Sequence, residues 1–190
     1  AQNLISGKMI VNAFSGAGLL SAYLAKTAKK VYGIEIVESS HINAENLRIN
    51  NHIDNLTNIL GDVAIELPKI SDFDSIVLDP PRKGCARPVL DTILQVAPNN
   101  IVYISCDPAT LSRDIGILKE KYDLVFINDD LNGSSAVKVI KQLKNVNLKD
   151  TKIIVMLNEN KEHIKNHYLT EYKCYDYLLK NDYENEMNRI

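Results

Sequence analysis

The sequence predicts an α/β fold built on a doubly wound, mainly parallel sheet. Short apolar runs alternate along the chain with helix-like segments. The runs are continuously apolar instead of alternating with polar residues, which is typical of strands covered on both faces. Regular alternation of strand and helix favours right-handed crossover connections. Ligands in such folds bind at the carboxyl ends of strands, so the residues that follow each strand are the candidates for a site.

The elements are predicted from apolar runs and from helical spacing. The strands are expected at Met9–Ala13, Val31–Ile36, Thr57–Leu60, Ser75–Leu78, Ile101–Ser105, Leu124–Ile127, Lys152–Leu157 and Tyr175–Leu179. The helices are expected at Leu19–Lys29, Ser40–Asn50, Pro88–Val96, Ala109–Glu120, Ser134–Lys144 and Lys161–Glu171.

Composition limits the class of protein. With 190 residues, 45% of them hydrophobic, the chain can form a sizeable core. We see no signal peptide at the start and no apolar run near the roughly 18 residues of a membrane span. The three cysteines, Cys85, Cys106 and Cys174, form no disulfide or zinc pattern, which favours a reducing cytoplasm and no metal. With a net charge of −2, neither part of the chain has the basic surplus expected of a self-sufficient nucleic-acid binder.

A glycine loop follows the first strand. It reads NAFSGAG and contains Gly16 and Gly18. Glycines here let the backbone approach a ligand closely. The third glycine of the dinucleotide fingerprint falls on Ser21, which disfavours a nicotinamide or flavin cofactor. A tight strand-to-helix turn without a ligand remains an alternative.

Carboxylates follow the second and third strands. Glu35 ends VYGIE, where it could accept hydrogen bonds from both ribose hydroxyls of a nucleoside or remain a solvated strand end. Asp62 in LGDV could accept from an adenine amino group or cap the next turn. Both alternatives are open for Asp62, whereas the glycine loop favours the ribose role for Glu35.

The fourth strand runs into LDPPRKG, residues 78–84. Two prolines make this backbone extended and rigid, so Asp79 is fixed at the strand end. Methyltransferases of exocyclic amines can carry an aromatic residue after the second proline. Arg82 stands there instead, which disfavours an amine target.

The fifth predicted strand leads to Cys106 in SCDPATLSRD. A cysteine there could be a core residue or a nucleophile. Asp107-Pro108 turns the chain into a helix, and a thiol near a helix N-terminus gains thiolate character. Cationic side chains on the two neighbouring segments could add positive potential: Arg82, Lys83, Arg87 and Arg113.

Together these motifs resemble the catalytic domain of the S-adenosylmethionine-dependent RNA uracil-C5 methyltransferases over residues of about 9–118. NAFSGAG, GIEIVESS, LGD, LDPPRKG and VYISCDPATLSRD look like that family's successive motifs. The resemblance implies S-adenosyl-L-methionine as cofactor, ribosomal or transfer RNA as substrate and Cys106 as nucleophile. The implied cofactor-binding residues, with the two glycines added, are Phe14, Gly16, Gly18, Glu35, Asp62 and Asp79. We expect Asp79, Arg82 and Arg113 to contact the RNA, with further RNA-binding elements outside this chain.

Two departures from the family pattern lie within this chain. Asn12 stands where the first motif usually begins with an acidic residue. No glutamate occurs between Lys121 and Thr151, where the family's catalytic base is expected. Enzymatic methyl transfer therefore competes with the reading of a cofactor-binding or structural scaffold without turnover.

Residues of about 122–180 instead resemble the second half of a response-regulator receiver domain. The phosphoacceptor and Ser/Thr positions fall on Asn128 and Leu157, while Lys180 matches the receiver's lysine. We therefore expect two parts. Residues 1–118 form an S-adenosylmethionine-binding Rossmann-like half. Residues 119–190 add flavodoxin-like β-α-β units on the same or an adjoining sheet. A receiver-like signalling module is a remote alternative.

Overall fold

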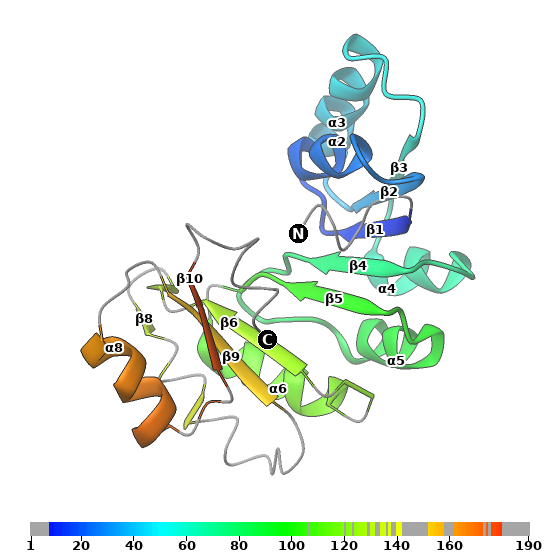
Figure 1. Ribbon diagram of the computed structural model, residues 1–190. Coiled ribbons are helices and arrows are strands. Elements are labelled where there is room, and N and C mark those ends of the chain that lie inside the picture. Colours follow the sequence, from blue (N-terminus) through cyan, green and yellow to red (C-terminus); the bar gives the residue numbers. More distant parts are fainter. Residues whose placement is uncertain are drawn as a thin grey trace. The chain divides into compact units, whose positions relative to one another are not determined.

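The computed structural model describes residues 8–105, 107–119, 121–122, 124–128, 130–131, 134–135, 137, 140–141, 152–157, 162–172, 174 and 176–179 (Figure 1). The chain divides into two compact units. The first unit comprises Ala1–Pro81 and Cys85–Ile104, and the second comprises Arg82–Gly84 and Ser105–Ile190. The assignment of a cofactor-binding half to residues 1–118 stays a prediction.

The first unit contains a five-stranded parallel sheet in the order β3-β2-β1-β4-β5 (Figure 1). Its strands are β1 (Met9–Ala13), β2 (Lys30–Glu35), β3 (Leu56–Leu60), β4 (Ser75–Leu78) and β5 (Asn100–Tyr103). The predicted α/β class with a parallel sheet is confirmed. The strand order reverses between β1 and β4, so the loop after β1 lies at the switch point where such sheets bind ligands.

Helices connect these strands, namely α2 (Leu19–Ala25), α3 (Glu38–Asn50), α4 (Val63–Glu66), the 3₁₀ helix η1 (Leu67–Lys69) and α5 (Arg87–Val96). α2 ends earlier than the predicted Lys29, because the backbone N–H of Lys29 donates to Lys8 O at 2.9 Å beside β1. The short α4 and η1 were not predicted, since four and three residues are too few to show a helical period.

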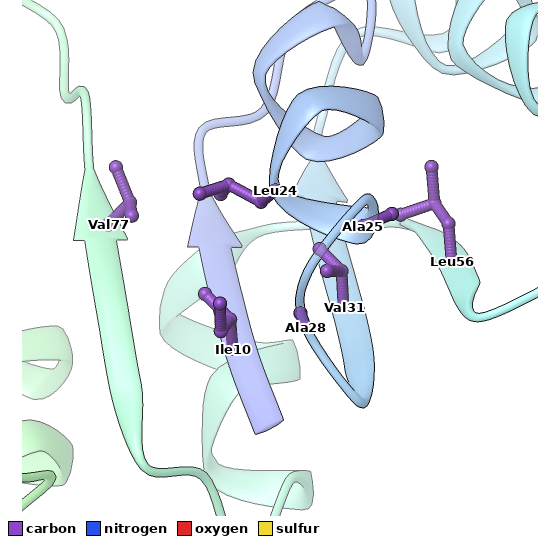
Figure 2. Packing of buried hydrophobic residues seen from close by; sticks show 7 residues of the cluster. All are labelled: Ile10, Leu24, Ala25, Ala28, Val31, Leu56 and Val77. Carbon is purple, nitrogen blue, oxygen red and sulfur yellow. The ribbon is translucent and has the colours of Figure 1, made fainter. Parts of the chain in front are cut away.

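The core beneath α2 joins four strands to this helix. Ile10, Val31, Leu56 and Val77 pack there with three α2-side residues, Leu24, Ala25 and Ala28 (Figure 2). Ile10 and Val31 are fully buried. Each such aliphatic side chain contributes about 1.5–3 kcal/mol on burial. The core therefore fixes α2 on β1 and β2, and with it both ends of the glycine loop.

The end of the fifth strand was predicted wrongly. β5 ends at Tyr103 and not at Ser105. Ile104 still donates its N–H to Leu78 O at 2.7 Å, but the Ser105 hydroxyl bonds locally to Asp107. The hydroxyl accepts from Asp107 N–H at 3.1 Å, a serine turn that takes the chain out of the ladder.

The second unit contains a three-stranded parallel sheet in the order β10-β9-β6 (Figure 1). The strands are β6 (Leu124–Asn128), β9 (Lys152–Leu157) and β10 (Asp176–Leu179). The helix α6 (Pro108–Leu118) precedes them, and α8 (Glu162–Asn166) continues into a π-helical turn, η2 (His167–Glu171). Leu111, Ile115 and Leu118 of α6 are buried, which matches the predicted apolar face.

The predicted helix at Ser134–Lys144 begins wrongly. Ser134–Ser135 form β8, which pairs antiparallel with β7 (Asp130–Leu131). The intervening sequence, Asn132-Gly133, is typical of a two-residue hairpin turn. Lys180 lies outside the described residues.

Candidate active site

The loops after four strands meet at the carboxyl edge of the first unit's sheet. Ser15 N–H donates to Ile34 O at 2.9 Å, and Gly61 N–H donates to Glu35 O at 2.9 Å. On the other side of β1, Asp79 N–H reaches Ala13 O at 3.5 Å. The sheet thus gathers the predicted cofactor-binding residues of the first unit along one edge.

Left-handed backbone shapes the loop after β1. Phe14, Gly16 and Gly18 have φ values of 62°, 56° and 83°. Such a value is strained for a phenylalanine, and strained residues cluster at functional sites. A Cβ on Gly18 would lie 2.8 Å from Ala44 Cβ, whereas a Cβ on Gly16 would meet nothing within 4 Å. Gly18 therefore serves close packing on α3, and Gly16 leaves open space beside the loop.

Glu35 joins this loop to the end of β2. Its carboxylate accepts Gly16 N–H at 2.8 Å and Val37 N–H at 2.7 Å, one bond on each oxygen. The residue is buried, with 9% of its surface exposed. Two carboxylate oxygens offer about four acceptor positions, so the carboxylate can still accept from a ligand hydroxyl.

Asp62 caps the short helix α4. Its Oδ1 accepts Ala64 N–H at 2.8 Å. Of the two alternatives for this residue, the cap is therefore formed. The cap occupies one carboxylate oxygen, and Asp62 is otherwise exposed beside Gly61, which is bonded to Glu35. The adenine role stays a prediction.

Exposed apolar side chains surround these two carboxylates, and the sequence reasoning missed them. Ile36 and Val37 follow Glu35, Leu60 ends β3 and Ile65 lies on α4. All four are about half exposed or more, with Ile36 and Ile65 at 61%. The sequence feature that could have identified these residues is the presence of apolar side chains at and directly after strand ends. They offer a surface to a flat ligand.

Asp79 follows β4 at the same edge. Desolvation of its carboxyl raises the pKa of Asp79 above the ordinary value, although the residue as a whole remains exposed. The neighbouring Pro80 is buried, which fixes the backbone here as the sequence predicted.

In the second unit, Asp107 begins α6. Its Oδ1 accepts the N–H groups of Ala109 and Thr110, both at 2.9 Å. These bonds, led by that from Thr110, together with the charge of Arg82, hold the pKa of Asp107 below its ordinary value. Cys106 precedes Asp107 in sequence but lies outside the described residues, so its role as nucleophile stays a prediction.

Two of the arginines expected to add positive potential are ion-paired. Arg113 bonds the carboxylate of Asp114 through Nε at 2.7 Å and through Nη2 at 2.6 Å, and also donates to Lys83 O. In the first unit, Arg87 Nε pairs with Asp91 at 2.7 Å. Substrate contact by Arg82 and Arg113 stays a prediction.

In the described part of the chain, no cluster of three or more His, Cys, Asp or Glu could hold a metal, and no helix is long and apolar enough to span a membrane.

The five-stranded parallel sheet, with the loops after its strands gathered at the carboxyl edge, defines a class of protein. The fold is that of the S-adenosylmethionine-dependent methyltransferases. The solved tRNA (uracil-54, C5)-methyltransferase of Pyrococcus abyssi, in complex with S-adenosyl-L-homocysteine, superimposes with a TM-score of 0.56 and 29% identity. That match covers 62% of this chain and 29% of the archaeal one.

Within this class, residues 60–127 match the tRNA (uracil-5-)-methyltransferase family. An RNA methyltransferase of Clostridium acetobutylicum is 45% identical over 121 residues, covering 61% of this chain and 26% of its own length. One from Clostridium tetani is 41% identical over 126 residues, with 62% and 26% covered. About 62% of the chain is thus similar to RNA methyltransferases, and the predicted resemblance of residues of about 9–118 is confirmed. The resemblance of residues of about 122–180 to a receiver domain stays a prediction. The chain spans about a quarter of the length of these relatives.

Proposed function

We propose that this chain carries the cofactor-binding and catalytic part of an RNA uracil-C5 methyltransferase that uses S-adenosyl-L-methionine. The observation that carries the proposal is the bond from Gly16 N–H to Glu35 at the sheet edge. It joins the glycine loop to a carboxylate at the switch point of a methyltransferase fold. Homology to RNA methyltransferases supports RNA as the substrate.

The residues at this edge fit the cofactor. Glu35 retains acceptor capacity for the two ribose hydroxyls. The open space at Gly16 admits a ligand close to the backbone. Ile36 and Leu60 offer apolar surface for the adenine, whose amino group Asp62 would accept. When bound, S-adenosylmethionine supplies a methyl group as a sulfonium electrophile.

The proposed reaction requires a nucleophile on the protein to activate the uracil. Uracil C5 is too weak a nucleophile to take a methyl group unaided. In the proposed reaction the Cys106 thiolate forms a bond to C6, and the displaced π electrons make an enolate that is nucleophilic at C5. After C5 has taken the methyl group, a base removes the C5 proton, the C6–S bond breaks and the double bond returns. Asp79 orients the uracil, which must be unpaired or flipped out of its stack.

A second candidate, a cofactor-binding scaffold without turnover, is favoured by the absence of glutamate between residues 121 and 151. The two candidates differ in proton removal and in whether Cys106 reacts. RNA affinity in both cases is expected to come mainly from elements beyond this chain, because its net charge is −2.

An adduct assay separates the two candidates. RNA containing 5-fluorouridine is incubated with the chain and S-adenosylmethionine, and covalent complexes are resolved under denaturing conditions. Because fluorine at C5 blocks elimination, we expect a methylated adduct that Cys106→Ala abolishes. Calorimetry with S-adenosylhomocysteine provides the control that this variant still binds cofactor. Cofactor binding without any adduct would favour the scaffold, and an adduct on another residue would reject the nucleophile.

A further inference from the structure

A groove of about 730 Å³ lies along α2 in the first unit. One wall is α2 with its C-cap residue, and the other is the end of α3 with the loop of residues 51–55. The principal lining side chains are Leu19, Tyr23, Lys26, Leu47, His52 and Ile53. None of the lining residues belongs to the predicted cofactor site, so this α2 groove is a separate feature of the unit.

The groove lies on the side of α2 that is turned away from the core. Ser21 and Leu24 are buried, and Leu24 packs on the strands (Figure 2). Leu19, Tyr23 and Lys26 follow one another at intervals of four and three residues, which places them together on the opposite face. Leu19 is 72% exposed and Tyr23 is 49% exposed. Apolar and aromatic surface is therefore available to a ligand along the groove.

Both ends of α2 are held against the elements that form the other wall. At its start, a Cβ on Gly18 would lie 2.8 Å from Ala44 Cβ of α3. Beyond its end, the Asn55 side-chain amide donates to Ala25 O at 2.7 Å and to Ala28 O at 2.9 Å. The groove is therefore formed before any ligand binds, which lowers the entropic cost of binding.

An aromatic ring and a cation lie together in the groove. Lys26 Nζ is 5.6 Å from the centroid of the Tyr23 ring, within the range of cation–π attraction. Because half of Tyr23 is exposed, the ring keeps surface on which a flat ligand can stack. Nucleobases stack on aromatic side chains, and a cation beside the ring attracts the phosphate of the same nucleotide.

The chain around the end of α2 is basic, although the whole chain has a net charge of −2. The segment from Lys8 to Ile34 contains four lysines and no acidic residue. The N–H groups of Lys29 and Lys30 both donate to Lys8 O, at 2.9 and 3.4 Å, so three of these lysines meet at the strand starts. Within the described ranges, none of the four lysines forms an ion pair. Their charge is available to a phosphate.

We propose that the α2 groove binds a nucleotide of single-stranded RNA, with the base stacked on Tyr23 and the phosphate on Lys26 and Lys29. The proposal rests on the proposed function in taking RNA as the ligand, and it adds a contact for the strand away from the cofactor edge. Asp54 is the one acidic residue among those that line the groove. Its carboxylate repels a phosphate but can accept from the exocyclic amino group of a base.

The test uses the 190-residue chain and a fluorescent single-stranded oligoadenylate. This probe contains no uracil, so the proposed methylation site does not contribute to its binding. Fluorescence anisotropy at several salt concentrations gives the affinity and its salt dependence. Photo-cross-linking with 8-azidoadenosine in the probe, followed by mass spectrometry, should label peptides that line the groove. Thermal unfolding checks that each variant is folded.

The variants separate stacking from charge. Tyr23→Leu keeps apolar bulk but loses the ring, so it should weaken binding about tenfold, whereas Tyr23→Phe should leave binding unchanged. Lys26→Gln should weaken binding and lower the slope of log affinity against log salt by about 0.7, the value for one phosphate contact on a single strand. Asp54→Asn should strengthen binding, because it removes repulsion of the phosphate.

A matched control comes from the second unit. Lys141 Nζ lies 5.8 Å from the centroid of the Tyr172 ring, a cation–π pair of the same kind outside the groove. Lys141→Gln should therefore leave affinity unchanged. A loss as large as that of Lys26→Gln would show unspecific attraction and overturn the proposal.

Two other results would also overturn the proposal. One is an affinity that Tyr23→Leu leaves unaltered, and the other is a cross-link confined to other surfaces, as expected if this face instead covers a protein segment. The 5-fluorouridine adduct tests the proposed function separately. If the groove variants weaken binding while the unaltered chain forms no adduct, the groove stands and the proposed function fails. If the adduct forms and the groove variants bind normally, the proposed function stands and the groove fails.

Discussion

The carboxylate of Glu35 accepts a hydrogen bond of 2.8 Å from the backbone N–H of Gly16, across 19 positions of sequence. The same carboxylate accepts Val37 N–H, so it joins the glycine loop to the residues after β2. This arrangement holds the loop in its left-handed conformation before any ligand binds. Preorganisation of this kind lowers the entropic cost of binding.

Glu35→Ala should weaken S-adenosylhomocysteine binding about tenfold or more, because it removes a charged acceptor from both the loop and the ligand. The affinity of Glu35→Gln should lie between those of the parent and of Glu35→Ala, because its amide keeps one acceptor oxygen. Calorimetric titration measures the affinities. Glu38→Ala, on the exposed first turn of α3, is the control and should leave affinity unchanged. Unaltered binding by Glu35→Ala would remove this residue from the site.

Gly18→Ala should lower the free energy of unfolding by about 2–4 kcal/mol, because a clash with Ala44 adds to left-handed strain. Gly16→Ala shares the positive φ but meets open space, so it should cost only about 1–2 kcal/mol. In the double variant Gly18→Ala with Ala44→Gly, the clash is relieved. The loss of unfolding free energy in this double variant should therefore be smaller than the sum of the losses in the two single variants. Urea denaturation tests all three. Strict additivity would show that the two residues do not contact.

Asp79→Asn should stabilise the protein at neutral pH. Desolvation raises the native pKa of Asp79, so the charged form is disfavoured in the folded chain. A raised carboxyl pKa lowers stability above the native pKa, and the difference disappears below the unfolded value of about 3.9. The urea midpoint of Asp79→Asn should therefore exceed that of the parent at pH 7, and the two midpoints should converge as the pH is lowered. Asp72→Asn, an exposed aspartate, should show no such gain.

Asp107→Ala should destabilise the second unit in a pH-dependent way. Hydrogen bonds led by Thr110 N–H hold the native pKa of Asp107 below its unfolded value. The cap therefore stabilises fully above the unfolded value of about 3.9, and this contribution is lost as the pH falls through the native pKa. Thermal unfolding at several pH values measures the difference. Asp107→Asn keeps an acceptor for the cap and should retain more stability, with a weaker pH dependence.

The strands and the residues that follow them could be predicted from the sequence. β1, β4 and β9 have the predicted bounds, because a continuously apolar run is a local record of burial on both faces. The positions of Gly16, Glu35 and Asp79 at strand ends follow from the same pattern. The methyltransferase family was predicted from the resemblance of successive motifs, above all LDPPRKG and VYISCDPATLSRD, to those of that family.

Tertiary structure decided the long-range partners of the charged side chains. Arg113 has the same local sequence whether or not it meets Lys83, and only the packing of Lys83 and Gly84 on α6 brings Lys83 O to its guanidinium. Asp62 accepts from Ala64 N–H as the cap of α4, and the four-residue α4 is too short to be predicted from a helical period. Burial patterns are encoded residue by residue along an element, whereas a contact such as that from Arg113 to Lys83 O depends on the distance between segments far apart in sequence, which exists only once the chain has folded.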